Sequence, residues 1–244
     1  MTKAKRTVRD EYGASAAQWD STFNATALNR IHAASCWRAF RKAIGSGYRT
    51  SVAVELGVGT GLFTDRISSE FDELIAVDFS QEMLDALALK LTACGIANVK
   101  YLHADAANLL TLPDASVDVV CCFGLLEDIA DSKALFTEIN RVLRPRGRFA
   151  GVASNRSCPW YPIRRIIAGD RWYWNGARLY SATELRAAAR SVKLVERNIF
   201  GWGVVPSQFP NWRLLAPFEL AERILEATPL ARFLGGLAFC FEKV

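Results

Sequence analysis

The sequence predicts an α/β fold with a doubly wound, mostly parallel sheet. At residues 52–61 a short apolar run leads into three alternate glycines, which is the pattern of a buried strand followed by a tight turn and a helix, here expected from residue 62 to about 69. Two further apolar segments downstream each end in a carboxylate, at Asp78 and Asp105. The 244 residues suit one domain of this class, with room for a sizeable core.

Composition excludes several kinds of protein. A hydrophobic content of 51% and a charged content of 23% are near the averages for soluble globular chains, which excludes a disordered or fibrous protein. No stretch approaches the roughly 20 apolar residues of a spanning helix, and the polar N-terminus contains no apolar signal core. We therefore expect a cytoplasmic protein without a membrane span.

Charge and cysteine content indicate neither nucleic acid nor metal as a partner. The net charge of +5 is dispersed apart from basic groups at residues 3–9 and 156–178, which favours a solvated surface over nucleic-acid binding. The cysteines show no Cys-x-x-Cys spacing, and with two histidines in the chain they are expected to be reduced structural thiols. They are Cys36, Cys94, Cys121, Cys122, Cys158 and Cys240.

The spacing of the three glycines distinguishes between nucleotide-binding motifs. A dinucleotide-binding turn would carry its third glycine at position 62, which is Leu62, and the Gly-Lys-Ser/Thr of a phosphate loop does not occur. The remaining pattern, Glu55-x-Gly57-x-Gly59-x-Gly61, resembles the first motif of the class I S-adenosylmethionine (AdoMet) methyltransferases. The resemblance implies that the glycine loop passes the aminoacyl part of AdoMet and that Glu55 helps to hold its ammonium. The alternative is a tight turn that binds no ligand.

The second predicted strand, residues 74–78, ends in Asp78. Its position about 20 residues beyond the glycine loop is typical of an acid that binds ribose hydroxyls. Ser80 is a predicted N-cap, and the helix that starts at residue 81 is expected to end at Gly95 in a left-handed stop. The resemblance places Phe79 and Met83 against adenine, with ordinary core contacts as the alternative.

The third predicted strand, residues 99–106, again ends in an aspartate. The resemblance implies that Asp105 accepts a hydrogen bond from the adenine amino group and that the backbone N–H of Ala106 serves a ring nitrogen. Capping of a following helix is the alternative for Asp105. His103, within the strand, is expected to be structural.

The fourth predicted strand, residues 117–124, is informative because of a motif that it lacks. Enzymes that methylate base amino groups carry Asn/Asp-Pro-Pro-Tyr at this point, whereas this chain has Cys122 and Phe123 followed by glycine and leucine. The difference disfavours a nucleic-acid substrate. Phe123 is expected beside the cofactor.

Four residues are candidates for a catalytic base. Small-molecule members of the family show Leu-Glu-His after the fourth strand, and here Glu127 is followed by Asp128, which stands where the histidine would be. His32 and Tyr12 are the other candidates. The alternatives are that Asp128 caps the next helix, expected to end at residue 143, and that His32 is a surface or packing residue.

Residues 1 to about 50 are expected to form a helical cap that ends at the glycines of residues 45–47. Within it, residues 12–20 resemble a Tyr-Asp-x-x-Ala-x-x-Tyr-Asp segment that many small-molecule methyltransferases place over the AdoMet site, with Tyr12 at the first aromatic position. The resemblance implies a lid, residues 1 to about 30, that orders with AdoMet. An aromatic pair that only fastens the cap to the core is the alternative.

A turn at residues 144–147 leads into the fifth predicted strand, residues 148–154. The family carries glycine where this chain has Arg146. With Pro145 at the second position and Gly147 at the fourth, we predict a type I turn, which needs no positive φ at Arg146.

The C-terminal third supplies the predicted acceptor site. Loops at residues 155–180 and 202–212 are rich in aromatic residues, whose rings bury planar apolar ligands well. Ser181 and Glu184 form a predicted capping box between them. The alternative is that the rings pack into a small core of their own. The predicted substrate-binding residues are Trp160, Trp172, Trp174, Trp202 and Trp212.

The remaining elements are a sixth strand at residues 193–200, an amphipathic helix at residues 214–227 and a last strand at residues 237–242. The resemblance places the last strand antiparallel beside the sixth. Glu219, Glu222 and Glu226 put acid on the polar face of the helix, which disfavours an anionic membrane surface.

The resemblance implies a Rossmann-like, seven-stranded domain with its last strand antiparallel and a helical cap at its N-terminus. One domain is expected over residues 1–244, divided into the cap (1–50), an AdoMet-binding half (51–153) and an acceptor-side half (154–244). It would methylate, without a metal, an oxygen or nitrogen of a small aromatic or apolar metabolite, as in secondary metabolism. Carbon methylation and a non-catalytic AdoMet-binding role are the alternatives, and homo-oligomers are left open.

Overall fold

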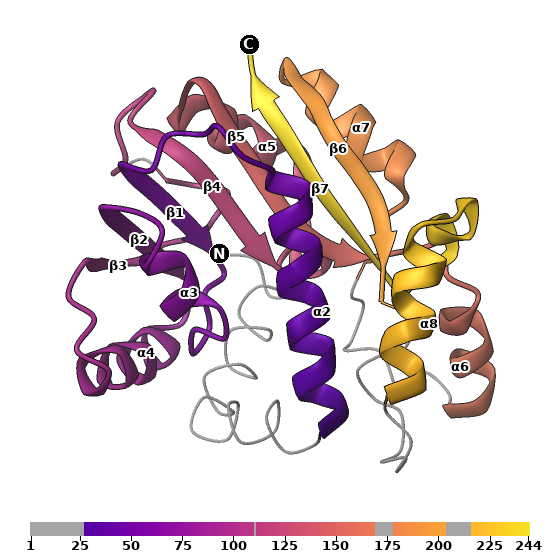
Figure 1. The fold of residues 1–244 in the computed structure, drawn as a ribbon. Helices are drawn as coiled ribbons and strands as arrows, with labels where there is room; N and C mark the ends of the chain where they lie inside the picture. The colour runs from indigo at the N-terminus through magenta and orange to yellow at the C-terminus, as the bar shows by residue number, and fades with distance from the viewer. Residues whose placement is uncertain (1–26, 110, 169–177, 204–215) are drawn as a thin grey trace.

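The computed structural model describes residues 27–109, 111–168, 178–203 and 216–244 (Figure 1). The predictions for Tyr12, Trp172, Trp174 and Trp212, and the expected lid, lie outside these residues. Within them, no helix has the combination of length and apolar character that a bilayer span requires.

A single seven-stranded sheet runs through the molecule (Figure 1). Its strands are β1 (Val52–Leu56), β2 (Glu73–Asp78), β3 (Val99–His103), β4 (Val117–Phe123), β5 (Leu143–Ser154), β6 (Leu194–Trp202) and β7 (Gly236–Lys243). They lie in the order β3-β2-β1-β4-β5-β7-β6, and the winding reverses between β1 and β4. β7 is antiparallel to both β5 and β6, whereas the other pairs are parallel. The predicted doubly wound sheet with an antiparallel last strand is confirmed.

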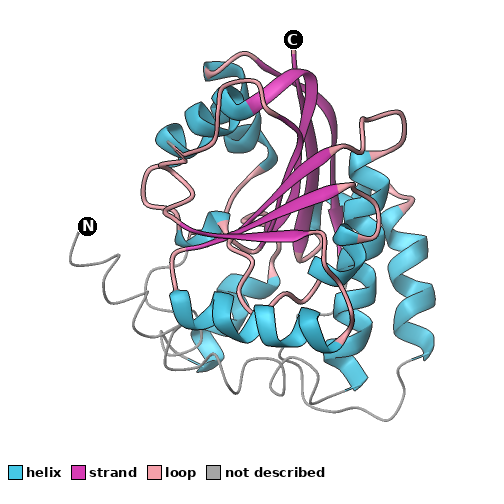
Figure 2. Ribbon diagram, turned by 90° about the vertical axis from the view of Figure 1, so that its left-hand side faces the viewer, coloured by secondary structure: helices cyan, strands magenta, loops and turns pink. Residues whose placement is uncertain are grey.

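Helices cover both faces of the sheet (Figure 2). They are α2 (Ala27–Ile44), α3 (Thr64–Ser68), α4 (Gln81–Ala93), α5 (Ser132–Val142), α6 (Trp160–Ala168), α7 (Ala182–Ser191) and α8 (Ala216–Glu226). Successive strand residues face opposite sides: Ala53 and Val119 pack with residues of α2 and α3, whereas Val54 and Val120 pack with residues of α5 and α7. This two-sided burial explains why the central strands are almost entirely apolar.

Helix ends follow the sequence signals where a cap or a glycine sets them. The Ser80 hydroxyl accepts a backbone N–H of the first turn of α4, and Gly95 follows that helix at φ +71°. Ser181 and Glu184 form the predicted capping box of α7. α3 begins at Thr64 and not at residue 62, because the glycine turn continues through residue 63.

α2 is the described part of the predicted cap. It lies across the face of the sheet formed by β5, β6 and β7, in front of these strands in Figure 1. Arg148 of β5 is buried and donates to the carbonyl oxygens of Ile44 and Ser46, at 2.7 and 2.9 Å, just where the helix ends. Asn198 of β6 donates to the carbonyl oxygen of Ala43 at 2.9 Å. The C-terminal end of α2 is therefore fixed to the sheet.

The turn at the start of β5 differs from the prediction. Arg146 has φ +66°, in the left-handed region, so the predicted type I turn is wrong. A positive φ at the residue after proline fits the third position of a type II turn, which favours glycine. The chain keeps this left-handed conformation although it carries arginine there.

Arg146→Gly should raise the free energy of unfolding by about 0.5–1 kcal/mol. Glycine avoids the cost of a left-handed L-residue, about 1–2 kcal/mol, while losing somewhat more chain entropy on folding. Urea unfolding followed by circular dichroism measures the change. Arg146→Ala is the matched control because it removes the same side chain and keeps the strain. Equal stabilities of the two variants would contradict this explanation.

Candidate functional site

The loop after β1 turns through its three glycines. The φ angles of Gly57, Gly59 and Gly61 are +65°, +54° and +78°, in the region that other residues rarely adopt. The N–H of Gly57 donates to the carbonyl oxygen of Val77 at 2.8 Å, so the loop bends over the end of β2. A Cβ at Gly61 would overlap with the side chains of Leu87 and Thr64, so any other residue there would have to displace both and adopt a strained φ.

Asp78, the last residue of β2, holds this loop in place. Its Oδ2 accepts the N–H of Gly59 at 2.8 Å, and its Oδ1 accepts the N–H of Ser80 at 2.9 Å. Burial raises the pKa of Asp78, against the lowering effect of these backbone hydrogen bonds. The N–H of Phe79 also donates to this carboxylate, so part of its capacity of about four hydrogen bonds remains for groups such as ribose hydroxyls.

Glu55 is buried within β1, beneath the glycine loop. Its Oε2 accepts a hydrogen bond from the Thr64 hydroxyl at 2.7 Å. Burial raises the pKa of Glu55 to about 8, while the Thr64 hydrogen bond and the charge of Lys90 lower it. The ammonium of Lys90 donates to the carbonyl oxygen of Gly61 at 3.0 Å, which places a cation at the end of the loop.

Glu55 should make the stability of the chain depend on pH. The unfolded chain loses this proton near pH 4.5 and the folded chain near pH 8. The stabilisation from the raised pKa is therefore fully present below pH 4.5 and is lost as the pH rises to 8, at about 1.4 kcal/mol per pH unit. Glu55→Gln cannot titrate, keeps an acceptor for Thr64, and should remove this slope. Urea unfolding across this range measures it, and an unchanged slope would contradict the assignment.

The predicted adenine residues lie at the ends of β2 and β3. β3 ends at His103, earlier than predicted, and His103 Nε2 lies 3.0 Å from the carbonyl oxygen of Phe79, which joins the two strand ends. Asp105 Oδ1 accepts the N–H of Ala107 at 3.0 Å. The described residues between β3 and β4 contain no helix, so the predicted capping alternative for Asp105 is wrong; its side chain closes a turn.

Two other predicted cofactor residues are buried. Met83 on α4 and Ala106 after β3 are both inaccessible or nearly so, whereas the Phe79 ring is only partly buried. The burial of Met83 fits the alternative given above for it, an ordinary core contact. Phe79 retains exposed surface at the strand end.

Phe123, at the end of β4, belongs to an aromatic cluster that the sequence did not reveal. Its ring lies 4.5 Å from that of Phe63, beside the glycine loop, and 4.8 Å from that of Phe40 on α2. Trp37 of α2 lies 6.0 Å from Phe63. The available signal was the spacing of Trp37 and Phe40, three residues apart on one helix. The cluster fastens α2 to the loop after β1 and the end of β4.

Glu127 follows β4 in the 3-10 helix η1 (Leu126–Asp128) and is only 9% exposed. Its Oε1 accepts the N–H of Ser154, at the end of β5, at 2.7 Å. Its Oε2 accepts no hydrogen bond within the described part of the chain. Burial raises the pKa of Glu127 and the neighbouring Asp128 adds to this, against the hydrogen bonds from Ser154. Such a carboxylate is suited to accept a proton near neutral pH.

Asp128 does not cap the helix after it. The cap of α5 is Asp131, whose Oδ1 accepts the N–H of Ala134 at 3.0 Å, because the helix begins at Ser132. The predicted capping alternative for Asp128 is therefore wrong. Leu125, just before η1, packs closely against the glycine loop, since a Cβ at Gly57 would lie 2.7 Å from the Leu125 side chain.

His32 and Trp202 lie together near the end of β6, an edge strand of the sheet, whereas the loops described so far follow β1 to β4. Their ring centroids are 5.1 Å apart, with His32 on α2 and Trp202 at the end of β6. Trp202 is buried and packs closely against Gly236 of β7. This ring contact fits the packing role given above as the alternative for His32. Trp160, the first residue of α6, is partly buried.

Comparison with known proteins finds a family model that includes these loops. Residues 54–151, from β1 into β5, match a family model described as a methyltransferase domain. This part of the chain is therefore similar to a methyltransferase domain. The matched range includes Glu55, the glycine loop, Asp78 and Asp105.

Several curated proteins are similar in sequence to part of this chain. A methyltransferase-like protein of Schizosaccharomyces pombe, itself uncharacterized, is 42% identical over 137 residues, which are 51% of this chain and 51% of that protein. A demethylmenaquinone methyltransferase of Clavibacter sepedonicus is 31% identical over 160 residues, 65% of this chain and 58% of the relative. The chain thus spans about half the length of the curated relatives that it matches.

The methyltransferase fold extends over nearly the whole chain. A SAM-dependent methyltransferase of Thermotoga maritima, described as a possible histamine N-methyltransferase, superposes with a TM-score of 0.71. The match covers 97% of this chain and 99% of that one, at 18% sequence identity. At this identity the likeness shows the fold alone.

Proposed function

We propose that this chain transfers the methyl group of AdoMet to an oxygen or nitrogen of a small aromatic or apolar metabolite. The observation that carries the proposal is the pair of hydrogen bonds that Asp78 accepts from the N–H groups of Gly59 and Ser80, which holds the loops after β1 and β2 together. Asp105 lies at the end of the adjoining β3. Ligands of doubly wound sheets bind outside the carboxyl ends of the strands, next to the point where the winding reverses, which here lies between β1 and β4.

Each loop has a proposed part in holding AdoMet. Glu55 and the glycine loop hold the aminoacyl part, with the positive-φ turn allowing a close approach of the backbone. The remaining acceptor sites of Asp78 hold the ribose hydroxyls. Asp105 and the N–H of Ala106 hold the adenine edge, beside the exposed surface of Phe79.

When bound, AdoMet supplies a methyl group already activated on a positively charged sulfur. The chain then has to align the acceptor with that methyl group and remove a proton from it. Glu127 is the proposed proton acceptor, because it is buried, its Oε2 is unpartnered among the described residues, and its pKa is raised. Asp128, His32 and Tyr12 are the other proposed candidates.

The acceptor is proposed to lie outside the ends of β4 and β5, between the N-terminal cap and the C-terminal aromatic loops. The relative named for a demethylmenaquinone acceptor supports an apolar substrate. Carbon methylation of a similar metabolite is the alternative reaction. A non-catalytic role, in which AdoMet is bound but not used, is the alternative from another class.

The test is methyl transfer by the purified chain. AdoMet labelled in its methyl group, incubated with a metabolite extract, should yield S-adenosylhomocysteine and a labelled small molecule whose mass and NMR spectra identify the methylated atom. If the labelled methyl group is on a carbon atom, the reaction is carbon methylation and not oxygen or nitrogen methylation. Binding of AdoMet without any S-adenosylhomocysteine would overturn the catalytic proposal.

A further inference from the structure

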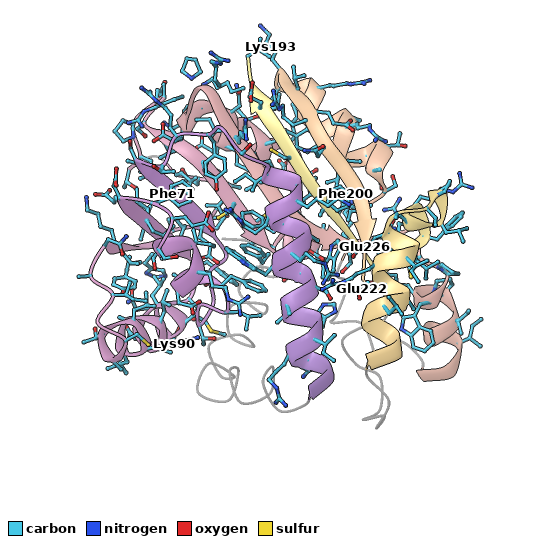
Figure 3. All side chains as sticks on the ribbon, viewed as in Figure 1. Phe71, Lys90, Lys193, Phe200, Glu222 and Glu226 are labelled. Atoms are coloured by element: carbon cyan, nitrogen blue, oxygen red, sulfur yellow. The ribbon has the colours of Figure 1, made fainter. Side chains whose placement is uncertain are left out.

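α8 turns its acidic side inward and its apolar side outward. Glu222 is 4% exposed and accepts a hydrogen bond from Arg38 of α2 at 2.6 Å, and Glu226 accepts from the same guanidinium at 3.3 Å. Figure 3 shows both carboxylates between α8 and α2. Leu220 and Ile224 stand about 200° around the helix from Glu222. They are 63% and 57% exposed, the reverse of an ordinary amphipathic surface helix.

Two adjoining elements also expose apolar side chains. The 3-10 helix η3 (Pro229–Phe233) packs against α8, and Tyr161 of α6 donates to the carbonyl oxygen of Gly235, just after η3, at 2.8 Å. Exposed apolar groups that gather in this way mark interaction sites. The outer apolar surface comprises Ile163 and Ile166 of α6, Leu220 and Ile224 of α8, and Leu230 and Phe233 of η3.

The exposed charges on this surface are positive. Among the described side chains of α8 and η3, Arg223 and Arg232 are the exposed charged residues. The Arg232 guanidinium lies 4.6 Å from the centre of the Phe233 ring, so cation and apolar surface are mixed. The sequence expectation that Glu222 and Glu226 disfavour an anionic surface is corrected, because both carboxylates face α2 and bind Arg38 there.

We propose that the outer apolar surface docks on a membrane that carries anionic lipids. The apolar side chains would enter the headgroup boundary while Arg223 and Arg232 meet the lipid phosphates, as in interfacial helices that lie on a bilayer without spanning it. A second copy of the chain fits this surface less well. A two-fold dimer through the same patch would bring the two sets of arginines together, whereas anionic lipid neutralises them.

Sedimentation with lipid vesicles tests the docking without reference to methyl transfer. The chain should sediment with vesicles of equal parts phosphatidylcholine and phosphatidylglycerol, and much less with phosphatidylcholine alone. Leu220→Ser combined with Ile224→Ser should lower the partition coefficient at least about tenfold. Arg223→Gln should lower it about fivefold, and added salt should weaken binding further.

Leu89→Ser is the matched control, since Leu89 is equally apolar and well exposed but lies on α4, at the opposite edge of the sheet. It should bind vesicles as the wild type does, and circular dichroism should show all variants folded. Three results would overturn the proposal: no sedimentation with anionic vesicles, equal sedimentation with neutral ones, or no effect of the α8 double variant. If analytical ultracentrifugation shows a dimer that the double variant abolishes, the partner of this surface is a second copy of the chain and not a lipid membrane.

Discussion

Replacing Asp78 by alanine should weaken binding of AdoMet by about 1.5–3 kcal/mol, or roughly 10- to 150-fold in Kd. The ribose hydroxyls would lose a charged acceptor. The variant should also lose about 2–4 kcal/mol of stability, because the N–H groups of Gly59 and Ser80 lose their partner. Isothermal titration calorimetry with S-adenosylhomocysteine, under conditions where circular dichroism shows the variant folded, measures the affinity.

Asp72→Ala is the matched control for this variant. Asp72 is an exposed aspartate just before β2, held by its backbone N–H to the carbonyl oxygen of Thr50. Its replacement should leave the affinity unchanged. Wild-type affinity in Asp78→Ala would remove Asp78 from the AdoMet site, whereas equal losses in both variants would point to a general effect of lost charge.

Glu127→Gln should lower turnover by about 10²-fold while the affinity for AdoMet stays the same. The amide keeps the shape and one acceptor for the Ser154 N–H but accepts no proton. Because burial raises the pKa of Glu127, the wild-type rate should increase as the pH rises through this raised pKa, where the carboxylate forms. The variant should lack that limb of the pH profile. Initial rates of S-adenosylhomocysteine release measure both effects.

Asp128→Asn is the comparison for Glu127→Gln, since it changes the neighbouring carboxylate in the same way. It should cost much less turnover if Glu127 takes the proton. Near-normal turnover in Glu127→Gln with a large loss in Asp128→Asn would exchange the two assignments. Near-normal turnover in both would show that the acceptor, such as an acidic phenol, needs no base from this segment.

Much of the fold could be predicted because its signals are local. The apolar runs that become β1, β2 and β4, the Ser80 cap and the capping box at Ser181 each depend on a few adjacent residues. The start of α3 was missed because nothing within residues 62–63 says how far the glycine turn extends. The positive φ of Arg146 was missed because an arginine, unlike a glycine, gives no sign of a left-handed backbone in the sequence.

Only part of the candidate site could be predicted from the sequence. Spacing was sufficient to single out Asp78, but its clamp on Gly59 is a tertiary contact across 19 positions. Burial of Glu127 against Ser154 likewise depends on β4 and β5 being neighbours. For α8, periodicity shows which residues share a face but not which face points inward. That choice depends on Arg38, which lies 184 positions from Glu222.

Hydrogen–deuterium exchange with and without S-adenosylhomocysteine tests most directly whether AdoMet binds across the loops after β1, β2 and β3. Saturating ligand should slow exchange at residues 57–62, 79–83 and 105–108, and should leave α7 and β6 unchanged. Protection confined to other segments, or none at all while calorimetry shows binding, would contradict the proposed site.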